Sequence, residues 1–358
     1  MTTPDTRRTT SADFRIVDLF AGPGGLDVAA AHLGIPVVAG IEIDKDARAT
    51  RLAAGLATHD EGDVRNCGPE DFPGATVLTG GPPCQTYTVA GSGAGRQALD
   101  AVVSLAKRMA AREEGLAEDF AKFGDERIGL VLEPLRWALA AIDAGKPYEA
   151  IVLEQVQGAM PVWTVMGNVL SSEGYDVAPP VVLQTEEYGV PQTRRRAILV
   201  ARWQGRAELP EPTHRPYRKG VDRSEGDSRK APWVTMGDVL GDRPDSFYVV
   251  SNYGTGSDPK ARGRRTSDMP SATVTGKISR NRLYLPDGEE LSRLTNEEAG
   301  LLQTFPADYR WSGNGVAQQI GNAIPPRLGV HVLAAALGLG DTALKEGLAS
   351  VDRSMGLM

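Results

Sequence analysis

The sequence predicts an α/β fold in which a mixed, mostly parallel sheet is accompanied by a smaller, irregular, β-rich domain. Three observations lead to this prediction. Over residues 14–202, short apolar runs alternate with amphipathic stretches through short connections, a pattern typical of parallel strands joined by helices. Between residues 203 and 285 the pattern stops, and the chain becomes basic and rich in loops. Regular patterning returns over residues 286–345, so we expect the first domain to be completed there.

Each expected element follows from its local pattern. Apolar runs predict strands at residues 14–20, 36–44, 62–66, 76–81, 148–156 and 194–202, of which 62–66 is either a strand end or a turn. Helical spacing predicts helices at residues 26–34, 46–55, 97–123 and 130–143, a helix and turn at 167–175, and a last helix within 318–338. Pro325 and Pro326 suit the start of the last helix, because a proline in the first turn sacrifices no helical hydrogen bond.

Several classes of protein are excluded by composition. Residues 1–13 have no apolar core and predict a disordered lead-in rather than a secretory signal, while residues 346–358 are expected to form a tail. No apolar run approaches the ~20 residues that a membrane span needs. Cys67 and Cys84 are too few for a disulfide framework and lack the spacing of a zinc site. We therefore expect a cytoplasmic protein without a metal.

Charge is distributed unevenly along the chain. The net charge is -7, yet residues 202–282 contain 16 Lys and Arg against 10 Asp and Glu, a local balance of +6 that leaves -13 for the rest. An acidic body with a basic module that binds nucleic acid would show this asymmetry. An ordinary solvated loop region would show it equally well.

The stretch DLFAGPGG, residues 18–25, predicts a ligand loop between a strand and a helix. Its spacing is not GxGxxG and Pro23 stiffens it, so a small zwitterion fits better than a pyrophosphate. Glu42 ends the next strand, about 20 residues on, where a carboxylate can accept both hydroxyls of a ribose. Asp63 follows and could accept from an adenine amino group. These acids suit S-adenosylmethionine, although each alone could be a solvated loop carboxylate.

A thiol, a carboxyl group and two guanidinium groups form the candidate reactive set. Cys84 follows a strand on a turn built from glycine and proline, which suits a nucleophile held at a cleft but also a small buried residue. Glu154 ends a later strand, where it could protonate or hold a ring nitrogen. Arg194 and Arg196 alternate along a strand and so point the same way, toward a carbonyl oxygen or a phosphate. A solvated strand edge is the alternative for these arginines.

Taken in order, the blocks DLFAGPGG, GGPPCQ, EQV, QTRRR and QQIGNAIPP closely resemble those of the DNA (cytosine-5)-methyltransferases of the restriction-modification type. The resemblance implies a Rossmann-like methyltransferase domain, residues 14–202 plus 286–345, and a target-recognition domain, residues 203–285. It implies that Cys84 adds to C6 of a cytosine flipped out of duplex DNA, that Glu154 acts at N3, and that Arg194 and Arg196 lie near the base and its phosphate. S-adenosylmethionine would donate the methyl group and leave as S-adenosylhomocysteine.

The resemblance also assigns binding positions. The cofactor would be held by Phe20, Gly22, Gly24, Leu26, Glu42, Ile43, Asp63, Val64, Pro82 and Asn322. DNA would be contacted by Gln85, Arg262, Arg264, Arg265 and Thr273. Double-stranded DNA is the expected partner and the chain is expected to be a monomer. The resemblance admits a cognate restriction endonuclease in the same system but does not require one.

Two departures from the family pattern leave questions open. Gln155 stands where the family usually has Asn, which affects how Glu154 is placed. The helical segment 97–123 is longer than the usual loop after the cysteine. The alternatives are a cytosine-5 methyltransferase that acts on RNA, a catalytically silent DNA-binding paralogue, and a cysteine hydrolase, which would need a histidine close to Cys84.

Overall fold

A computed structural model describes residues 10–83, 93–113, 115–116, 127–251 and 263–358. Cys84, Gln85 and Arg262 lie outside these residues. The strands are β1 (Ile16–Leu19), β2 (Val37–Ile41), β3 (Val77–Gly80), β4 (Ala150–Val156), β5 (Asp176–Gln184), β6 (Arg195–Arg202), β7 (Tyr248–Val250), β8 (Arg264–Thr266), β9 (Arg282–Tyr284) and β10 (Glu290–Leu291). The helices are α1 (Gly25–His32), α2 (Lys45–Ala53), α3 (Gly93–Ala110), α5 (Arg127–Leu130), α6 (Glu133–Asp143), α7 (Met160–Ser172), α8 (Met236–Val239), α9 (Asn296–Leu302), α10 (Val316–Asn322), α11 (Pro326–Leu337) and α12 (Gly340–Ser354).

The larger sheet confirms the predicted α/β class. Its order is β2-β1-β3-β4-β6-β5, and β1 to β4 run parallel, whereas β6 is antiparallel to both of its neighbours. The segment expected as strand end or turn at 62–66 is a 3-10 turn, Val64–Asn66. β5 is not among the strands that the sequence predicts.

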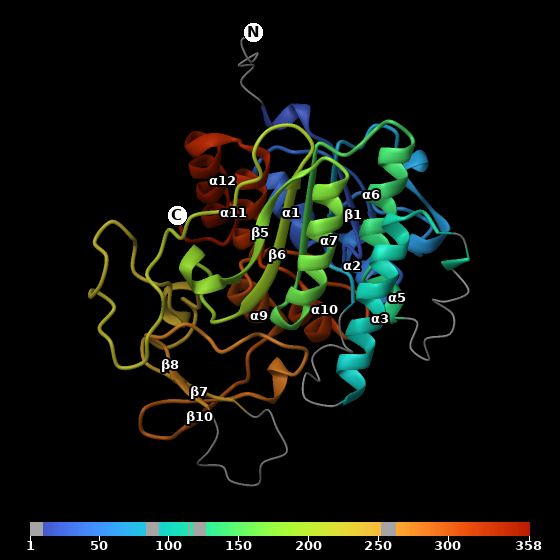
Figure 1. The fold of residues 1–358 in the computed structure, drawn as a ribbon. Coiled ribbons are helices and arrows are strands. Elements are labelled where there is room, and N and C mark those ends of the chain that lie inside the picture. The colour runs from blue at the N-terminus through green and yellow to red at the C-terminus, as the bar shows by residue number, and fades with distance from the viewer. Residues whose placement is uncertain (1–9, 84–92, 114, 117–126, 252–262) are drawn as a thin grey trace.

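Helices cover both faces of this sheet (Figure 1). Side chains of β1 alternate between the two layers, as a period of two requires. Ile16 packs in a core cluster with residues of α1, α11 and α12, while Val17 packs in a second cluster with residues of α3, α6 and α7. In the described residues no helix is long and apolar enough to span a bilayer.

A second, antiparallel sheet of order β10-β9-β7-β8 lies below the first in Figure 1. It extends to Leu291, beyond the boundary expected at residue 285. A second correction concerns the end of the chain. The expected tail from residue 346 is mostly part of α12, whose Val351 is fully buried in the core cluster that contains α1 and α11. The apolar contacts that order this helix come from segments distant in sequence.

A buried ion pair connects α1 to α2 beneath the ligand loop. Both terminal nitrogens of Arg51 donate to the Asp27 carboxylate, at 2.8 and 2.7 Å, and Nη2 also donates to the Ala57 carbonyl at 2.7 Å. The two side chains are almost inaccessible to water. Removing one partner of such a pair leaves a buried charge without compensation.

We therefore expect Arg51→Met to lower the free energy of unfolding by about 3–5 kcal/mol, measured by denaturant unfolding. Arg229→Met is the matched control, because Arg229 and Asp227 form an exposed pair. That control should unfold at the wild-type midpoint. A wild-type midpoint for Arg51→Met would show that this pair does not stabilise the fold.

Candidate active site

The site is a cavity of about 490 Å³ at the carboxyl ends of the four parallel strands. Residues that follow β1, β2 and β3 line it, together with the end of β4. The opposite wall comes from α10 and from Thr275 and Gly276, which follow the small sheet's strand β8. Ligands of open α/β sheets bind at this edge, and the volume is in the range of small-molecule sites.

The loop between β1 and α1 is shaped by two glycines. Gly22 has φ +54° and donates its N–H to Oε2 of Glu42 at 2.8 Å. Gly24 has φ +103°, and a Cβ there would lie 2.2 Å from the Leu56 side chain. Asp44 N–H donates to the other oxygen of Glu42 at 2.7 Å. The Glu42 carboxylate is thus fixed against the loop, and each oxygen keeps a lone pair for a ligand hydroxyl.

Carboxyl groups dominate the charge on this side of the cavity. Burial raises the pKa of Glu42, and the backbone hydrogen bonds oppose that rise. Asp18, at 2% exposure, lines the cavity and accepts from Thr79 Oγ1 at 2.5 Å. Burial and the nearby Asp27 raise the pKa of Asp18 to about 8. This side of the cavity therefore presents carboxyl groups as hydrogen-bond partners, which suits the hydroxyl and amino groups of S-adenosylmethionine better than a phosphate.

Glu154 and Arg196 meet across the β4–β6 pair. Arg196 Nε forms an ion pair with Oε1 of Glu154, whose residue exposure is 7%. Burial lowers the pKa of the Arg196 guanidinium, and the carboxylate beside it opposes that effect. Both side chains line the cavity. Gln155, the departure from the family pattern, donates from Nε2 to the Pro82 carbonyl, so it anchors the backbone two residues before Cys84.

Arg194 has a different environment from Arg196. It is 2% exposed, and its terminal nitrogens donate to the carbonyls of Val274 at 2.9 Å, Gly321 at 2.8 Å and Ala323 at 3.1 Å. Burial lowers its pKa well below the ordinary value. Arg194 directly precedes β6, and Arg196, but not Arg194, is among the residues that line the cavity. The structure adds that the Arg194 guanidinium binds the backbone of the cavity wall.

The predicted cofactor residues are only partly brought together. The cavity is lined by Phe20, Gly22, Leu26, Glu42, Ile43 and Asn322. Gly24 and Pro82 lie beside lining residues without being part of the lining. Asp63 does not end a strand: it caps the 3-10 turn, and its ion pair with Arg65 at 2.6 Å lowers its pKa. Val64 is buried in the second core cluster.

Other lining residues were missed by the sequence interpretation. They include Asp18, Gln155, Thr275, Gly276 and Gln318. A charged residue inside the apolar run at 14–20 was the available signal for Asp18. Thr275 and Gly276 directly follow the predicted residue Thr273 and its neighbour, and the fold brings them to Gly321.

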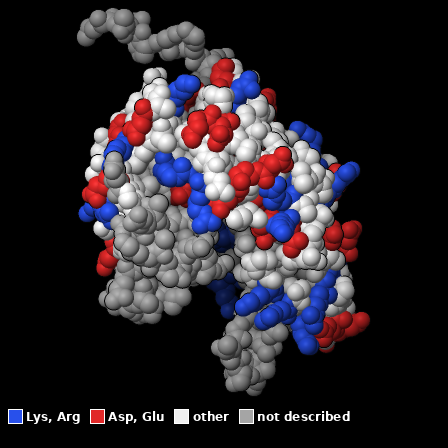
Figure 2. Space-filling view, turned by 90° about the vertical axis from the view of Figure 1, so that its right-hand side faces the viewer, with Lys and Arg blue, Asp and Glu red and all other residues white. Residues whose placement is uncertain are grey.

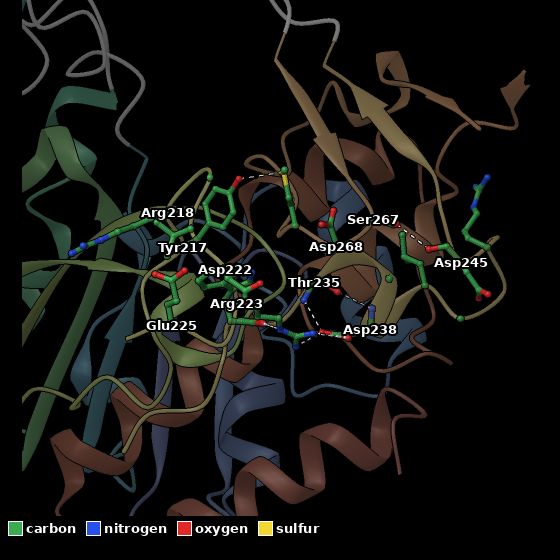
Figure 3. Close-up of a pocket in the computed structure, with 18 of the residues that line it drawn as sticks. Tyr217, Arg218, Asp222, Arg223, Glu225, Thr235, Asp238, Asp245, Ser267 and Asp268 are labelled. Atoms are coloured by element: carbon green, nitrogen blue, oxygen red, sulfur yellow. Dashed lines mark hydrogen bonds and ion pairs between the residues drawn. The ribbon is translucent and has the colours of Figure 1, made fainter. Parts of the chain in front are cut away.

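A larger cavity, of about 740 Å³, lies within the smaller domain, where Asp222, Asp238 and Asp268 line it (Figure 3). Arg223 pairs with Asp238 at 2.6 Å. Its carboxylates make it a poor site for DNA phosphate, and it contains none of the predicted reactive residues.

Comparison with known proteins decides the family. The model of the C-5 cytosine-specific DNA methylases matches residues 14–105, 121–246 and 228–337. The chain belongs to this family. It is 28% identical over 363 residues to the type II methyltransferase M.Eco47II of Escherichia coli, covering 92% of this chain and 80% of that protein. A protein of Oceanobacillus iheyensis named as a type II methyltransferase, M.OihORF3336P, is 29% identical over 276 residues; the alignment covers 66% of this chain and 55% of that protein.

Solved structures support the methylase fold. The S. pombe Dnmt2 methyltransferase superposes with a TM-score of 0.61 at 20% identity, covering 91% of this chain and 98% of that one. The Entamoeba histolytica methyltransferase EhMeth gives a TM-score of 0.58 at 14% identity, with 92% and 99% coverage. At these identities the similarity establishes the fold of this cytosine-5 methylase.

The fixed carboxylate of Glu42 allows a test of the cofactor site without turnover. If Glu42 holds the ribose as predicted, Glu42→Ala would remove two charge-assisted hydrogen bonds to the ligand, and it also removes the acceptor of the Gly22 and Asp44 N–H groups. We expect the Kd for S-adenosylhomocysteine, measured by calorimetry without DNA, to rise about 10- to 150-fold. The exposed Glu70→Ala should bind as the wild type does. Unchanged affinity in Glu42→Ala would remove Glu42 from the cofactor site.

Proposed function

We propose that this cytosine-5 methylase transfers a methyl group from S-adenosylmethionine to C5 of a cytosine that is flipped out of a short, specific sequence of double-stranded DNA. The bond-forming nucleophile is the Cys84 thiolate. The observation that carries the proposal is the Glu154–Arg196 pair in a cavity whose other end is the Glu42 loop. Gly81 and Pro83 line the same cavity, and Cys84 is the next residue of the chain.

Each reactive residue then has one task. The thiolate adds to C6, the π electron pair of the C5–C6 bond moves into the C4–C5 bond, and the pair of the C4–N3 bond moves onto N3, where Glu154 stabilises the proton. C5 becomes nucleophilic and takes up the methyl group, which the bound cofactor supplies in activated form. Loss of the C5 proton to a base then restores the double bond and expels the thiolate. Arg196 holds Glu154 in place and adds positive charge at the base.

Arg194 acts through the backbone in this proposal. Its contacts with Val274, Gly321 and Ala323 hold the cavity wall together, so its effect on the flipped nucleotide is one of positioning. The Thr273 side chain also forms a hydrogen bond within the protein, because its hydroxyl donates to the Thr193 carbonyl at 2.8 Å. Pro82 supports the cysteine turn through its carbonyl, and Gly24 permits the cofactor turn.

Duplex DNA is the proposed partner. Figure 2 shows a hollow in one face of the molecule, with Lys and Arg side chains gathered at its lower margin. Flipping a base costs a few kcal/mol, which contacts of cationic side chains with phosphates would offset. The enzyme would act as a monomer in the cytoplasm, with a cognate restriction endonuclease in the same system.

Two assays with the full chain test the proposal. The first compares transfer of tritiated methyl groups to duplex DNA and to RNA. The second asks for a covalent complex with duplex DNA that contains 5-fluorocytosine. We expect transfer to DNA and a trapped complex. Transfer to RNA alone would indicate an RNA methyltransferase, and binding without transfer or trapping would indicate a silent paralogue.

A further inference from the structure

The small sheet presents two faces with different chemistry. In antiparallel pairs, residues directly opposite one another share a face. Arg265 lies opposite Val249, which is buried, as is Leu283 in the next strand. Arg264 lies opposite Val250, on the other face. Two arginines that are neighbours in sequence therefore point in opposite directions.

Arg265 is tied to the body of the protein. Its Nη2 donates to Thr193 Oγ1 at 3.2 Å, and its guanidinium lies 4.6 Å from the ring centre of Tyr217. The Tyr217 hydroxyl in turn donates to Met269 Sδ at 3.2 Å (Figure 3). Arg265 thus fixes the small sheet to the segment that carries Arg194 and Arg196.

Arg264 is exposed but held flat. Its guanidinium carbon lies 3.4 Å from the ring centre of Tyr248, and Tyr248 stacks on Tyr284 with ring centres 5.3 Å apart. Stacking on an aromatic face leaves the edge of the guanidinium free to donate. Within the described residues, no carboxylate forms an ion pair with Arg264.

The position of Arg264 relates it to the cavity. Arg264, Ala272 and Lys219 line one small pocket, while Thr275 lines the active-site cavity. The three residues from 272 to 275 span at most about 10 Å. The pocket that Arg264 lines and the active-site cavity are therefore joined by a short stretch of chain.

We propose that Arg264 is a specificity-determining residue that reads a guanine of the recognised sequence near the target cytosine, and that Arg265 positions the sheet from which it acts. The proposal rests on the function proposed above. A flat guanidinium that can donate two parallel hydrogen bonds matches O6 and N7 of guanine in the major groove. Tyr248 restricts the side chain before DNA arrives, so less rotational freedom is lost on binding.

The test is a methylation profile over many sequences. The wild type and variants are expressed in cells, and every methylated cytosine is mapped with its flanking bases by bisulfite sequencing. For Arg264→Ala we expect preference for guanine at one position of the recognised sequence to fall about 5- to 150-fold, with other positions unchanged. Arg264→Lys keeps the positive charge but lacks the two parallel N–H donors of the guanidinium, so it should lose the same preference. Tyr248→Leu should weaken it.

Arg282→Ala is the matched control. Arg282 lies on the same face of the sheet, opposite Val250, and pairs with Glu290 at 3.5 Å. It should keep the wild-type profile. An active Arg264→Ala enzyme with an unchanged profile, or with a uniform loss over all sequences as expected for a phosphate contact, overturns the proposal. A wild type that methylates no DNA cytosine overturns the proposed function itself.

Discussion

Cys84→Ser is expected to abolish methyl transfer while leaving the affinity for S-adenosylhomocysteine within a few-fold of the wild type. A serine hydroxyl is hardly ionised at neutral pH, whereas a cysteine is a strong nucleophile even when only partly ionised. Removing the bond-forming nucleophile of an enzyme costs on the order of 10⁴ or more in turnover. The measurement is tritium transfer to duplex DNA, with cofactor affinity determined separately by calorimetry.

Cys67→Ser is the matched control, since these are the two cysteines of the chain. Cys67 is buried, and burial raises the pKa of its thiol to about 11. It lies outside the cavity lining and should be dispensable for transfer. If Cys84→Ser turns over at a substantial rate, the thiolate mechanism is wrong. If Cys67→Ser alone is inactive, the nucleophile has been assigned to the wrong cysteine.

Glu154→Gln is expected to lower the rate of transfer by about 10² or more. The amide keeps the size of the side chain, and its oxygen can still accept a hydrogen bond from Arg196. It carries no charge to stabilise a proton on N3, so addition of the thiolate to C6 becomes harder. The first-turnover rate on duplex DNA reports this step directly.

The control for this substitution is Glu186→Gln. Glu186 is also buried, and burial raises its pKa to about 7, but it lies outside the cavity lining. Glu186→Gln should transfer methyl groups at the wild-type rate. Both variants should bind S-adenosylhomocysteine normally. Wild-type turnover by a folded Glu154→Gln enzyme would exclude the role at N3.

Strand β5 illustrates why part of the fold escaped the sequence interpretation. Pro179 and Pro180 interrupt its apolar pattern, and proline normally argues against a strand. The strand exists because it is at the edge of the sheet, and its register shifts between Ala178 and Val181, where the prolines lie. Edge position and bulge are properties of the assembled sheet.

Asp63 shows the same limit within the site. Short apolar pieces around it suggested a third strand, which would have brought its carboxylate to the common edge. The chain forms a 3-10 turn there instead, and the Asp63 carboxylate forms an ion pair with Arg65, two residues further on. The ion pair with Arg65 and the capping contact of Asp63 stabilise this turn, whereas the strand pattern there was weak.

The sequence by itself determined the order in which the strands end. Parallel strands joined by helices place their carboxyl ends at one edge of the sheet. The sequence therefore also determined that this edge brings together the Gly22 loop, Glu42, the turn before Cys84 and Glu154. Only the tertiary structure decided which partner each arginine binds. Arg194 binds carbonyls 80 and more residues away, and Arg196 meets Glu154 across two strands. Arg264 and Arg265 acquire different neighbours only when their strand is paired in the small sheet. Burial and partner depend on segments that the chain brings together by folding, and identical side chains acquire different roles from them.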